Sequence, residues 1–316
     1  MSLLPTEPAH RLAERPEERR WLVEGLWADD AVGIVGGEPK CCKSFLALDL
    51  CVAVASGKGC LRRYPVPRPG RVLLYAAEDA LHLVRRRLDG ICRAAGVEIA
   101  ALDVQVITAP ALRLDVEDDR QRLAETVAAL QPRLLVLDPF VRLHRIDENV
   151  SGEVAPLLAY LRELQRRHQV AVVLVHHARK GAARVRAGQA LRGSSEFHAW
   201  GDSNLYLRRH GEQITLTVEH RAAPSAAGIT LELRADGDAL ALAVIDAPSG
   251  APAPAPATSV EERVERALAT ATGPLGVAEL RNACRVRMQT LCDALAALAA
   301  QGRVRRTAAG YLGASR

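Results

Sequence analysis

The sequence predicts an α/β fold with a mainly parallel sheet extended by antiparallel strands, followed by a small helical domain. Three observations predict it. Between residues 31 and 177, apolar runs alternate with amphipathic segments, and the runs are apolar throughout, which is typical of parallel strands covered on both faces. After residue 200, four short runs follow one another at hairpin spacing. A Pro/Ala-rich stretch then precedes a tail with helical periodicity.

These boundaries predict a domain over 1–246, an extended linker over 247–259 and a separate domain over 260–316. In the first domain, a strand begins at residue 31, and further parallel strands are expected at 71–79, 104–108, 133–138 and 171–177, with helices at 43–55, 80–94, 117–130 and 151–169. Antiparallel strands are expected at 203–210, 212–221, 228–235 and 240–246. The tail predicts helices at 260–270, 277–284 and 288–301 and a two-stranded wing at 302–313, which is the order of a winged helix-turn-helix.

Composition favours a cytoplasmic protein without membrane contact. Of the 316 residues, 49% are hydrophobic and 3% aromatic, so the core is expected to be rich in Leu, Val and Ala. The N-terminus has no apolar signal core, and no uncharged apolar run reaches the roughly 18 residues of a membrane span. Seven scattered cysteines without a C-x-x-C pair indicate reduced, mostly buried thiols rather than a redox or metal site.

A glycine-led loop lies between the first strand and its helix. It reads G-E-P-K-C-C-K-S, close to the phosphate-loop pattern G-x-x-x-x-G-K-[ST], with Cys42 in place of the second glycine. Two of the four lysines of this Arg-rich chain lie in it, and a lysine ammonium can reach between phosphates. We expect Lys43 to contact the β- and γ-phosphates of ATP and Ser44 to hold Mg²⁺. The alternative is a plain strand-turn-helix with a stray lysine. The expected ATP-binding residues are Gly37, Glu38, Pro39, Lys40, Cys41, Cys42, Lys43 and Ser44.

Hydrolysis requires more than a phosphate loop, and three strand ends offer the other groups. Asp138 follows the apolar run LLVL and is expected to be a second magnesium anchor. Glu78 ends another strand and is expected to activate or orient water. The alternative is that Glu78 or Asp79 caps the next helix, and Asp79 is the residue expected to do so. His176 and His177 end a third strand, and because neighbouring strand residues face opposite sides, only one should face the nucleotide. The alternative is a histidine pair that makes local hydrogen bonds.

These motifs, GGEPKCCKS, YAAED, LLVLD, VVLVHHARKG and LRGSS, lie within residues 21–210. With them the chain resembles the RecA-like P-loop ATPases, and more closely the RepA-type hexameric replicative helicases, AAA family ATPases of plasmid and phage type. The resemblance implies ATP and Mg²⁺ at Lys43 and Ser44, Mg²⁺ also at Asp138, water activation by Glu78, and a γ-phosphate sensor at His177, with His176 as second choice. It also implies a homo-oligomeric ring, expected to be a hexamer, in which an arginine of a neighbour completes each ATP site. The candidates for this arginine are Arg208, Arg209 and Arg192.

Two basic segments are candidate DNA contacts. Residues 179–192 contain no acid, and in RecA-like rings this loop lines the channel, so it is expected to attract single-stranded DNA through the phosphates. Residues 276–316 hold seven arginines against two acids, which suits duplex DNA in a winged helix. The alternatives are a solvated loop and a winged helix with protein contacts only. The candidate DNA-binding residues are Arg179, Lys180, Arg184, Arg186, Arg285, Arg287 and Arg305.

The sequence thus favours an ATP-hydrolysing DNA-associated motor, a RepA-like oligomeric helicase acting on single-stranded DNA. The alternative is an ATP-controlled DNA-binding regulator or replication-initiation accessory that does not translocate. A small-molecule kinase is disfavoured, because the sequence suggests neither a lid nor an acceptor site.

Overall fold

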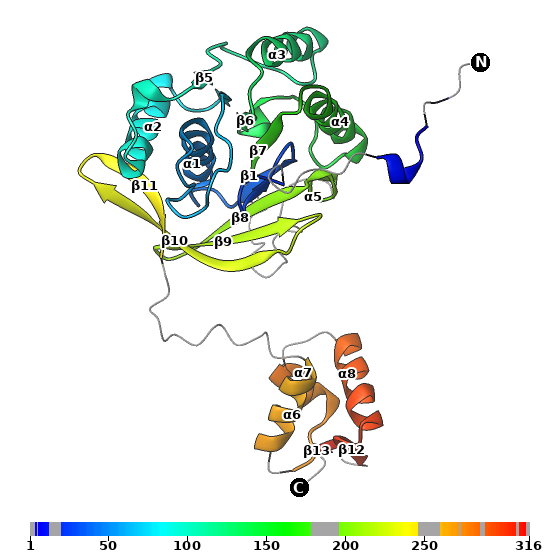
Figure 1. The fold of residues 1–316 in the computed structure, drawn as a ribbon. Helices are drawn as coiled ribbons and strands as arrows, with labels where there is room; N and C mark the ends of the chain where they lie inside the picture. The colour runs from blue at the N-terminus through cyan, green and yellow to red at the C-terminus, as the bar shows by residue number, and fades with distance from the viewer. Residues whose placement is uncertain are drawn as a thin grey trace. The chain divides into compact units, whose positions relative to one another are not determined.

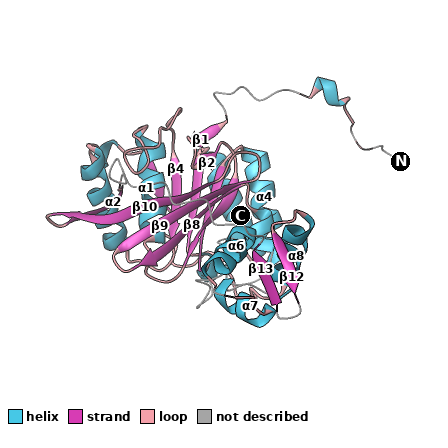
Figure 2. Ribbon diagram, turned by 90° about the horizontal axis from the view of Figure 1, so that it is seen from below, coloured by secondary structure: helices cyan, strands magenta, loops and turns pink. Residues whose placement is uncertain are grey.

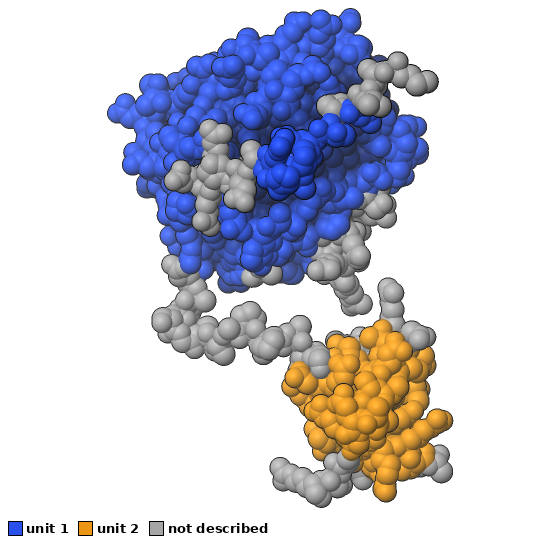
Figure 3. Space-filling model, turned by 45° about the vertical axis from the view of Figure 1, so that its right-hand side comes forward, with its two compact units in different colours: residues 1–246 blue, residues 247–316 orange. Residues whose placement is uncertain are grey.

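The computed structural model describes residues 4, 6–12, 20–177, 196–245, 260–271, 273–284, 288–307 and 310–313. The chain divides into two compact units, Met1–Asp246 and Ala247–Arg316, which Figure 3 colours separately. The predicted linker over 247–259 lies outside the described residues. Within the described ranges, no helix combines the length and the apolar character that a bilayer span requires.

The first unit is built on a nine-stranded sheet of order β11-β10-β9-β8-β3-β7-β6-β4-β5 (Figure 1). The strands from β8 to β5 pair in parallel, and β9, β10 and β11 extend the sheet in antiparallel fashion, as the sequence predicts for 212–221, 228–235 and 240–246. The prediction for 203–210 is wrong in part: as β8, this strand pairs in antiparallel fashion with β9 but in parallel with β3, because hairpin spacing specifies only the neighbour along the chain. Figure 2 looks onto this extension, where β8, β9 and β10 lie side by side. The parallel strands are β3 (Val32–Gly37), β4 (Val72–Ala76), β5 (Val104–Val106), β6 (Leu134–Asp138), β7 (Ala171–His177) and β8 (Ser203–His210). The antiparallel strands are β9 (Gln213–His220), β10 (Ala226–Asp236) and β11 (Ala239–Val244).

Helices cover both faces of the parallel part, which explains why its strands are apolar throughout. Alternate residues of one strand enter different cores: Val35 and Val173 pack with the helices α1 and α2, whereas Ile34 and Leu174 pack with α3 and α4. Figure 1 shows these two helix pairs on opposite sides of the sheet. Their bounds are α1 (Lys43–Ser56), α2 (Leu81–Ala95), α3 (Glu117–Leu130) and α4 (Ser151–His168), and the short α5 (Glu196–Trp200) contacts α4.

Several short elements were not predicted. A hairpin of β1 (Trp21–Val23) and β2 (Trp27–Ala28) precedes β3, and its Trp27 side chain is fully buried. Among the described residues there are also short 3₁₀ helices: η1 (Ala9–Arg11) precedes β1, and η3 (Ile99–Ala101) and η4 (Phe140–Arg142) lie in connections. Segments of two or three residues carry no periodicity, so sequence patterns do not reveal them.

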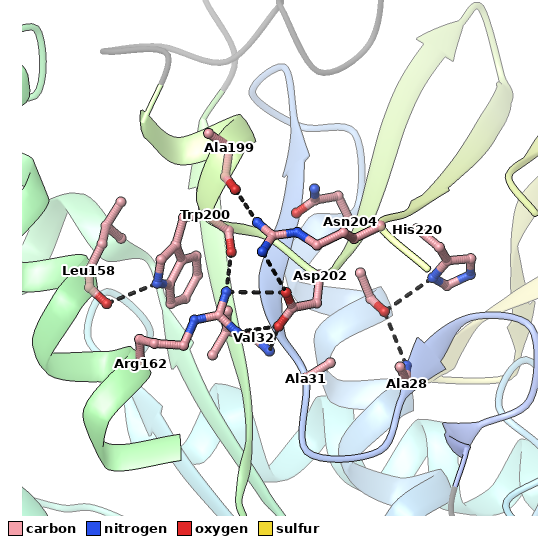
Figure 4. A network of polar contacts seen from close by, with 12 residues as sticks. Ala28, Ala31, Val32, Leu158, Arg162, Ala199, Trp200, Asp202, Asn204 and His220 are labelled. Atoms are coloured by element: carbon pink, nitrogen blue, oxygen red, sulfur yellow. Dashed lines mark hydrogen bonds and ion pairs between the residues drawn. The ribbon is translucent and has the colours of Figure 1, made fainter. Parts of the chain in front are cut away.

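A polar network fixes the beginning of β8 against β3 (Figure 4). The Asp202 carboxylate accepts a hydrogen bond from the Val32 backbone N–H at 3.3 Å and is also bound by the Arg162 guanidinium of α4. Two residues on, Asn204 Oδ1 accepts from the Ile34 N–H at 3.1 Å. These contacts tie β8 to its parallel neighbour, so the end of β8 comes to lie beside the loop that follows β3.

The described residues of the second unit form three helices and one hairpin in the order that the sequence predicts. They are α6 (Val260–Thr270), α7 (Val277–Cys284), α8 (Met288–Ala300), β12 (Val304–Thr307) and β13 (Gly310–Gly313). Side chains from all three helices form its small core, including Val264, Leu280 and Leu295.

Candidate nucleotide-binding site

The loop between β3 and α1 packs directly on β8. A Cβ added at Gly37 would lie 2.4 Å from the Leu207 carbonyl oxygen and 2.6 Å from Cys41 Sγ, so the first position of the motif requires glycine. Beyond Gly37, the backbone turns through two residues of positive φ, Lys40 at 64° and Cys42 at 67°. The chain then enters α1 at Lys43, with Cys42 as the N-cap residue.

Cys42 occupies the position of the missing second glycine in a left-handed conformation, with φ 67° and ψ 27°. Glycine adopts this conformation freely, whereas another residue pays about 1–2 kcal/mol. The Arg209 side chain from the end of β8 contacts this part of the loop: its Nε donates to the Lys40 carbonyl oxygen at 3.1 Å, and its Nη2 lies 3.2 Å from Cys42 Sγ. The loop therefore keeps a left-handed turn at this position without the glycine.

Lys43 is buried inside its own loop. Its Nζ donates to the Glu38 carbonyl oxygen at 2.7 Å and lies 3.9 Å from Cys41 Sγ. Burial lowers the pKa of Lys43, and nearby Cys41 and Asp138 act in the opposite direction. A buried ammonium is stabilised by an anion, and a phosphate would supply a stronger partner than the carbonyl.

The two predicted magnesium ligands line the same cavity. Asp138 ends β6, and Ser44 lies in the first turn of α1, where hydrogen bonding from its hydroxyl acts to lower the pKa of Asp138. A hydroxyl and a carboxylate are the hard oxygen ligands that Mg²⁺ prefers. No group of three His, Cys, Asp or Glu side chains suited to hold a metal occurs among the described residues. These two residues therefore fit a Mg²⁺ that takes its other ligands from phosphate and water.

The acidic pair after β4 is divided between two arginines. Glu78 Oε1 accepts from Arg142 Nε at 2.7 Å, and both side chains are exposed. The prediction that Asp79 caps the next helix is wrong: the N-cap of α2 is Ala80, without a side-chain hydrogen bond, and Asp79 instead pairs with Arg87 inside α2. An arginine eight residues away offers the carboxylate a charged partner, which the N-terminal N–H groups do not.

The two histidines at the end of β7 face opposite sides of the sheet. His177 lines the cavity at the loop, whereas His176 is buried on the other side, stacked on Phe197 with ring centroids 4.4 Å apart. There, His176 Nδ1 lies 4.0 Å from Glu148 Oε1, and His144 Nε2 approaches the same oxygen at 3.4 Å. Of the pair that the sequence left open, His177 is the one on the side of the loop.

A cavity of about 300 Å³ brings together the loop and the ends of β4, β6 and β7. The cavity is lined by Lys40, Cys42, Lys43, Ser44, Phe45, Glu78, Arg87, Asp138, Pro139, Val175 and His177.

The sequence analysis did not predict that Arg87, Phe45 and Arg142 belong to this region. The guanidinium of Arg87 lies 5.4 Å from the centroid of the Phe45 ring. The triple-arginine run at 85–87 was the only sequence signal for Arg87, and there was no such signal for Arg142.

Larger cavities exist elsewhere in the first unit, but size does not locate the site. One of about 640 Å³ lies between α2 and the β10–β11 hairpin and is lined by several arginines. Acidic neighbours pair three of them, since Arg62 binds Asp49, Arg93 binds Asp89, and Arg234 binds Glu232. This charge balance gives little attraction for an anion.

The arginines proposed to act on a neighbouring subunit lie in different places. Arg209 contacts the loop of its own chain, as described above, and the adjacent Arg208 lines a cavity of about 670 Å³ over β8 and β9. Arg192 lies outside the described residues, as do the candidate DNA contacts Arg179, Lys180, Arg184, Arg186, Arg285 and Arg287.

In the second unit, the described arginines lie on α6, on α7 and at the hairpin, and none lies on α8. Arg305 is exposed on β12. The sequence of α8, MQTLCDALAALAA, has no lysine or arginine, and its Asp293 is exposed. A recognition helix that binds in a major groove normally presents side chains that donate hydrogen bonds to base edges or phosphates.

Comparison with known protein families matches residues 2–183 to the AAA domain, more than half of the chain. The chain belongs to the AAA domain family. The first unit therefore contains an AAA domain, which is a P-loop ATPase domain, as the loop motif predicts. Among solved structures, the chain is similar to a KaiC-like protein from the hyperthermophilic archaeon Pyrococcus horikoshii OT3, at 14% identity and a TM-score of 0.48, over 71% of this chain and 94% of that one.

One prediction for the AAA domain follows from the buried carboxylate of Asp138. Burial raises its pKa to about 6, against the lowering effect of the Ser44 hydrogen bond and Lys43. Because the folded protein binds this proton more tightly than the unfolded chain, the contribution of Asp138 to stability falls as the pH rises from about 4 to about 6. Asp138→Asn should therefore stabilise the nucleotide-free protein at pH 7.5 by about 1–3 kcal/mol, and by less at pH 5.

Thermal unfolding of both proteins at these two pH values measures the difference. Asp103→Asn is the control of opposite sign, because the hydrogen bond from Arg71 lowers the pKa of Asp103, so its loss should cost stability at pH 7.5. An Asp138→Asn effect that is the same at both pH values would contradict the assigned cause.

Proposed function

We propose that this AAA domain protein is an ATPase that uses hydrolysis to move along single-stranded DNA, as a RepA-type helicase does. The ATPase part is supported by one observation above the others: Lys43, Ser44 and Asp138 come from two separate elements and meet at one cavity. Glu78 and His177 reach the same cavity from two further strands. A plain strand-turn-helix would not require this convergence.

The proposed roles follow from these positions. The Lys43 ammonium binds the β- and γ-phosphates, and Ser44 and Asp138 hold Mg²⁺, which neutralises the charge that develops on the phosphates. Glu78 orients the attacking water and accepts its proton. His177 donates to the γ-phosphate from the end of β7 and so can report its loss to the segment that follows.

A homo-oligomeric ring, expected to be a hexamer, is part of this proposal, because an arginine from a neighbour would then complete each site. Arg208 and Arg192 are the candidates for that role. A cytoplasmic location is proposed too, since all seven cysteines are free thiols and five of them are buried.

The DNA part is supported by charge. The segment 179–192 is basic and free of acids, and it follows the strand that carries His177. Residues 260–316, proposed to form a winged helix, add arginines around their hairpin. The regulator hypothesis needs duplex affinity from this second unit, and the absence of lysine and arginine from the α8 sequence weakens it.

ATP turnover with and without DNA distinguishes the two functions. For a motor, single-stranded DNA should raise the rate several-fold, the effect should fall steeply with salt, and ATP should drive strand displacement on a forked duplex. The double variant Arg184→Ala/Arg186→Ala should lose more of the stimulation than of the basal rate. Turnover that ignores single-stranded DNA, together with tight duplex binding, would favour the regulator instead.

A further inference from the structure

Arg209 contacts the nucleotide loop of its own subunit at the two residues whose backbone is left-handed. Its Nε donates to the Lys40 carbonyl oxygen at 3.1 Å, and its Nη2 lies 3.2 Å from Cys42 Sγ. One planar guanidinium therefore spans the turn on which the second glycine is missing, and its fork suits two simultaneous contacts. A glycine at position 42 would offer no sulfur to this group.

The backbone that carries Arg209 is well anchored. The other end of β8 is bound to β3 through Asp202 (Figure 4) and through Asn204. Near the loop, Gly37 is in parallel register with Leu207, two residues before Arg209. A fixed strand thus presents the guanidinium to the loop, whereas the loop itself contains two residues in a strained conformation.

We propose that Arg209 is a positioning residue that acts within its own subunit and holds the loop in the turn that accepts phosphate. It compensates for the glycine that Cys42 replaces. The inference rests on the proposed binding of ATP at this loop. It separates Arg209 from the arginines that would act on a neighbour, because a positioning residue affects nucleotide affinity, whereas an arginine on the transition state affects kcat.

A double-mutant cycle with Cys42→Gly tests the proposal. Binding of a fluorescent non-hydrolysable ATP analogue with Mg²⁺ is measured for the wild type, Arg209→Ala, Cys42→Gly and the double variant. Arg209→Ala should weaken binding about tenfold in the wild-type background and about twofold or less in the Cys42→Gly background, since glycine needs no support in this turn. Arg208→Ala, on the neighbouring position of β8, is the matched control and should show no coupling to position 42.

Turnover separates the outcomes further. Arg209→Ala should raise KM by the same factor as the dissociation constant of the analogue, and it should leave kcat within about threefold of the wild-type value. A loss of kcat with unchanged analogue binding, recovered when Arg209→Ala is mixed with Lys43→Ala subunits, would show that Arg209 acts on a neighbour and overturn the inference. Equal effects of Arg209→Ala in both backgrounds would overturn it too. Failure of the wild type to bind the analogue would instead remove the proposed function. Arg209 is exposed, and Arg209→Met, which keeps the length of the side chain, repeats the test if the alanine variant is poorly folded.

Discussion

Lys43→Ala should reduce ATP turnover by about 10²–10³-fold or more, and it should weaken nucleotide binding as well. The ammonium is buried among the loop carbonyl of Glu38, Cys41 and Asp138, so alanine removes the one compact cation that the loop encloses. Fold and stability should survive, since the substitution removes a buried charge rather than a packed apolar group. Steady-state phosphate release and analogue binding measure the two effects.

Lys58→Ala is the matched control for this result. Lys58 lies just beyond the other end of α1 and is exposed, so its removal takes away a lysine near that helix without changing the loop. It should retain normal turnover. If Lys43→Ala hydrolysed ATP as fast as Lys58→Ala does, the loop would not be the site of the reaction.

Glu78→Gln should bind MgATP close to normally and yet hydrolyse it about 10²–10⁴-fold more slowly. Glutamine keeps the shape and a hydrogen bond but cannot accept the proton of the attacking water. The present partner of Glu78, Arg142, is exposed and can be exchanged for water or substrate. Single-turnover hydrolysis separates this chemical step from binding.

The neighbouring carboxylate supplies the comparison. Asp79 is bound by Arg87 and does not line the cavity. Asp79→Asn should therefore lose no more than about tenfold of the rate. If Asp79→Asn bound ATP without hydrolysing it and Glu78→Gln hydrolysed it normally, the base that accepts the proton of the attacking water would be Asp79.

Much of the fold was predictable, because long elements carry their own signals. The helix over 117–130 begins with three acidic residues, which suit its N-terminus, and the predicted range agrees with α3. The strand over 171–177 is likewise found as β7. The antiparallel strands β9, β10 and β11 followed from the short runs at hairpin spacing after residue 200, whereas the parallel pairing of β8 with β3 did not, because the two strands lie far apart in the sequence. The β1–β2 hairpin was not predictable, since its strands have three and two residues.

The site was predictable in its residues more than in its contacts. The alternation of a strand shows that His176 and His177 point to opposite faces of the sheet. Only the packing shows which one faces the loop, because His177 lines the cavity there and His176 stacks on Phe197. The contacts of Arg209, Arg142 and Arg87 join segments apart in the chain, and a single sequence carries no signal for such pairs. Asp79 is a similar case: the sequence favoured it as the cap of α2, but in the structure its carboxylate pairs with Arg87 inside that helix.

The proposed ATPase depends on one site that binds a triphosphate, and a crystal structure with Mg²⁺ and excess non-hydrolysable ATP analogue would show whether the site does so. We expect the β- and γ-phosphates within the loop, the Lys43 ammonium moved from the Glu38 carbonyl onto them, and Mg²⁺ between Ser44 and Asp138. A loop without nucleotide, with the Lys43 ammonium still on the Glu38 carbonyl, would show that this loop does not bind ATP.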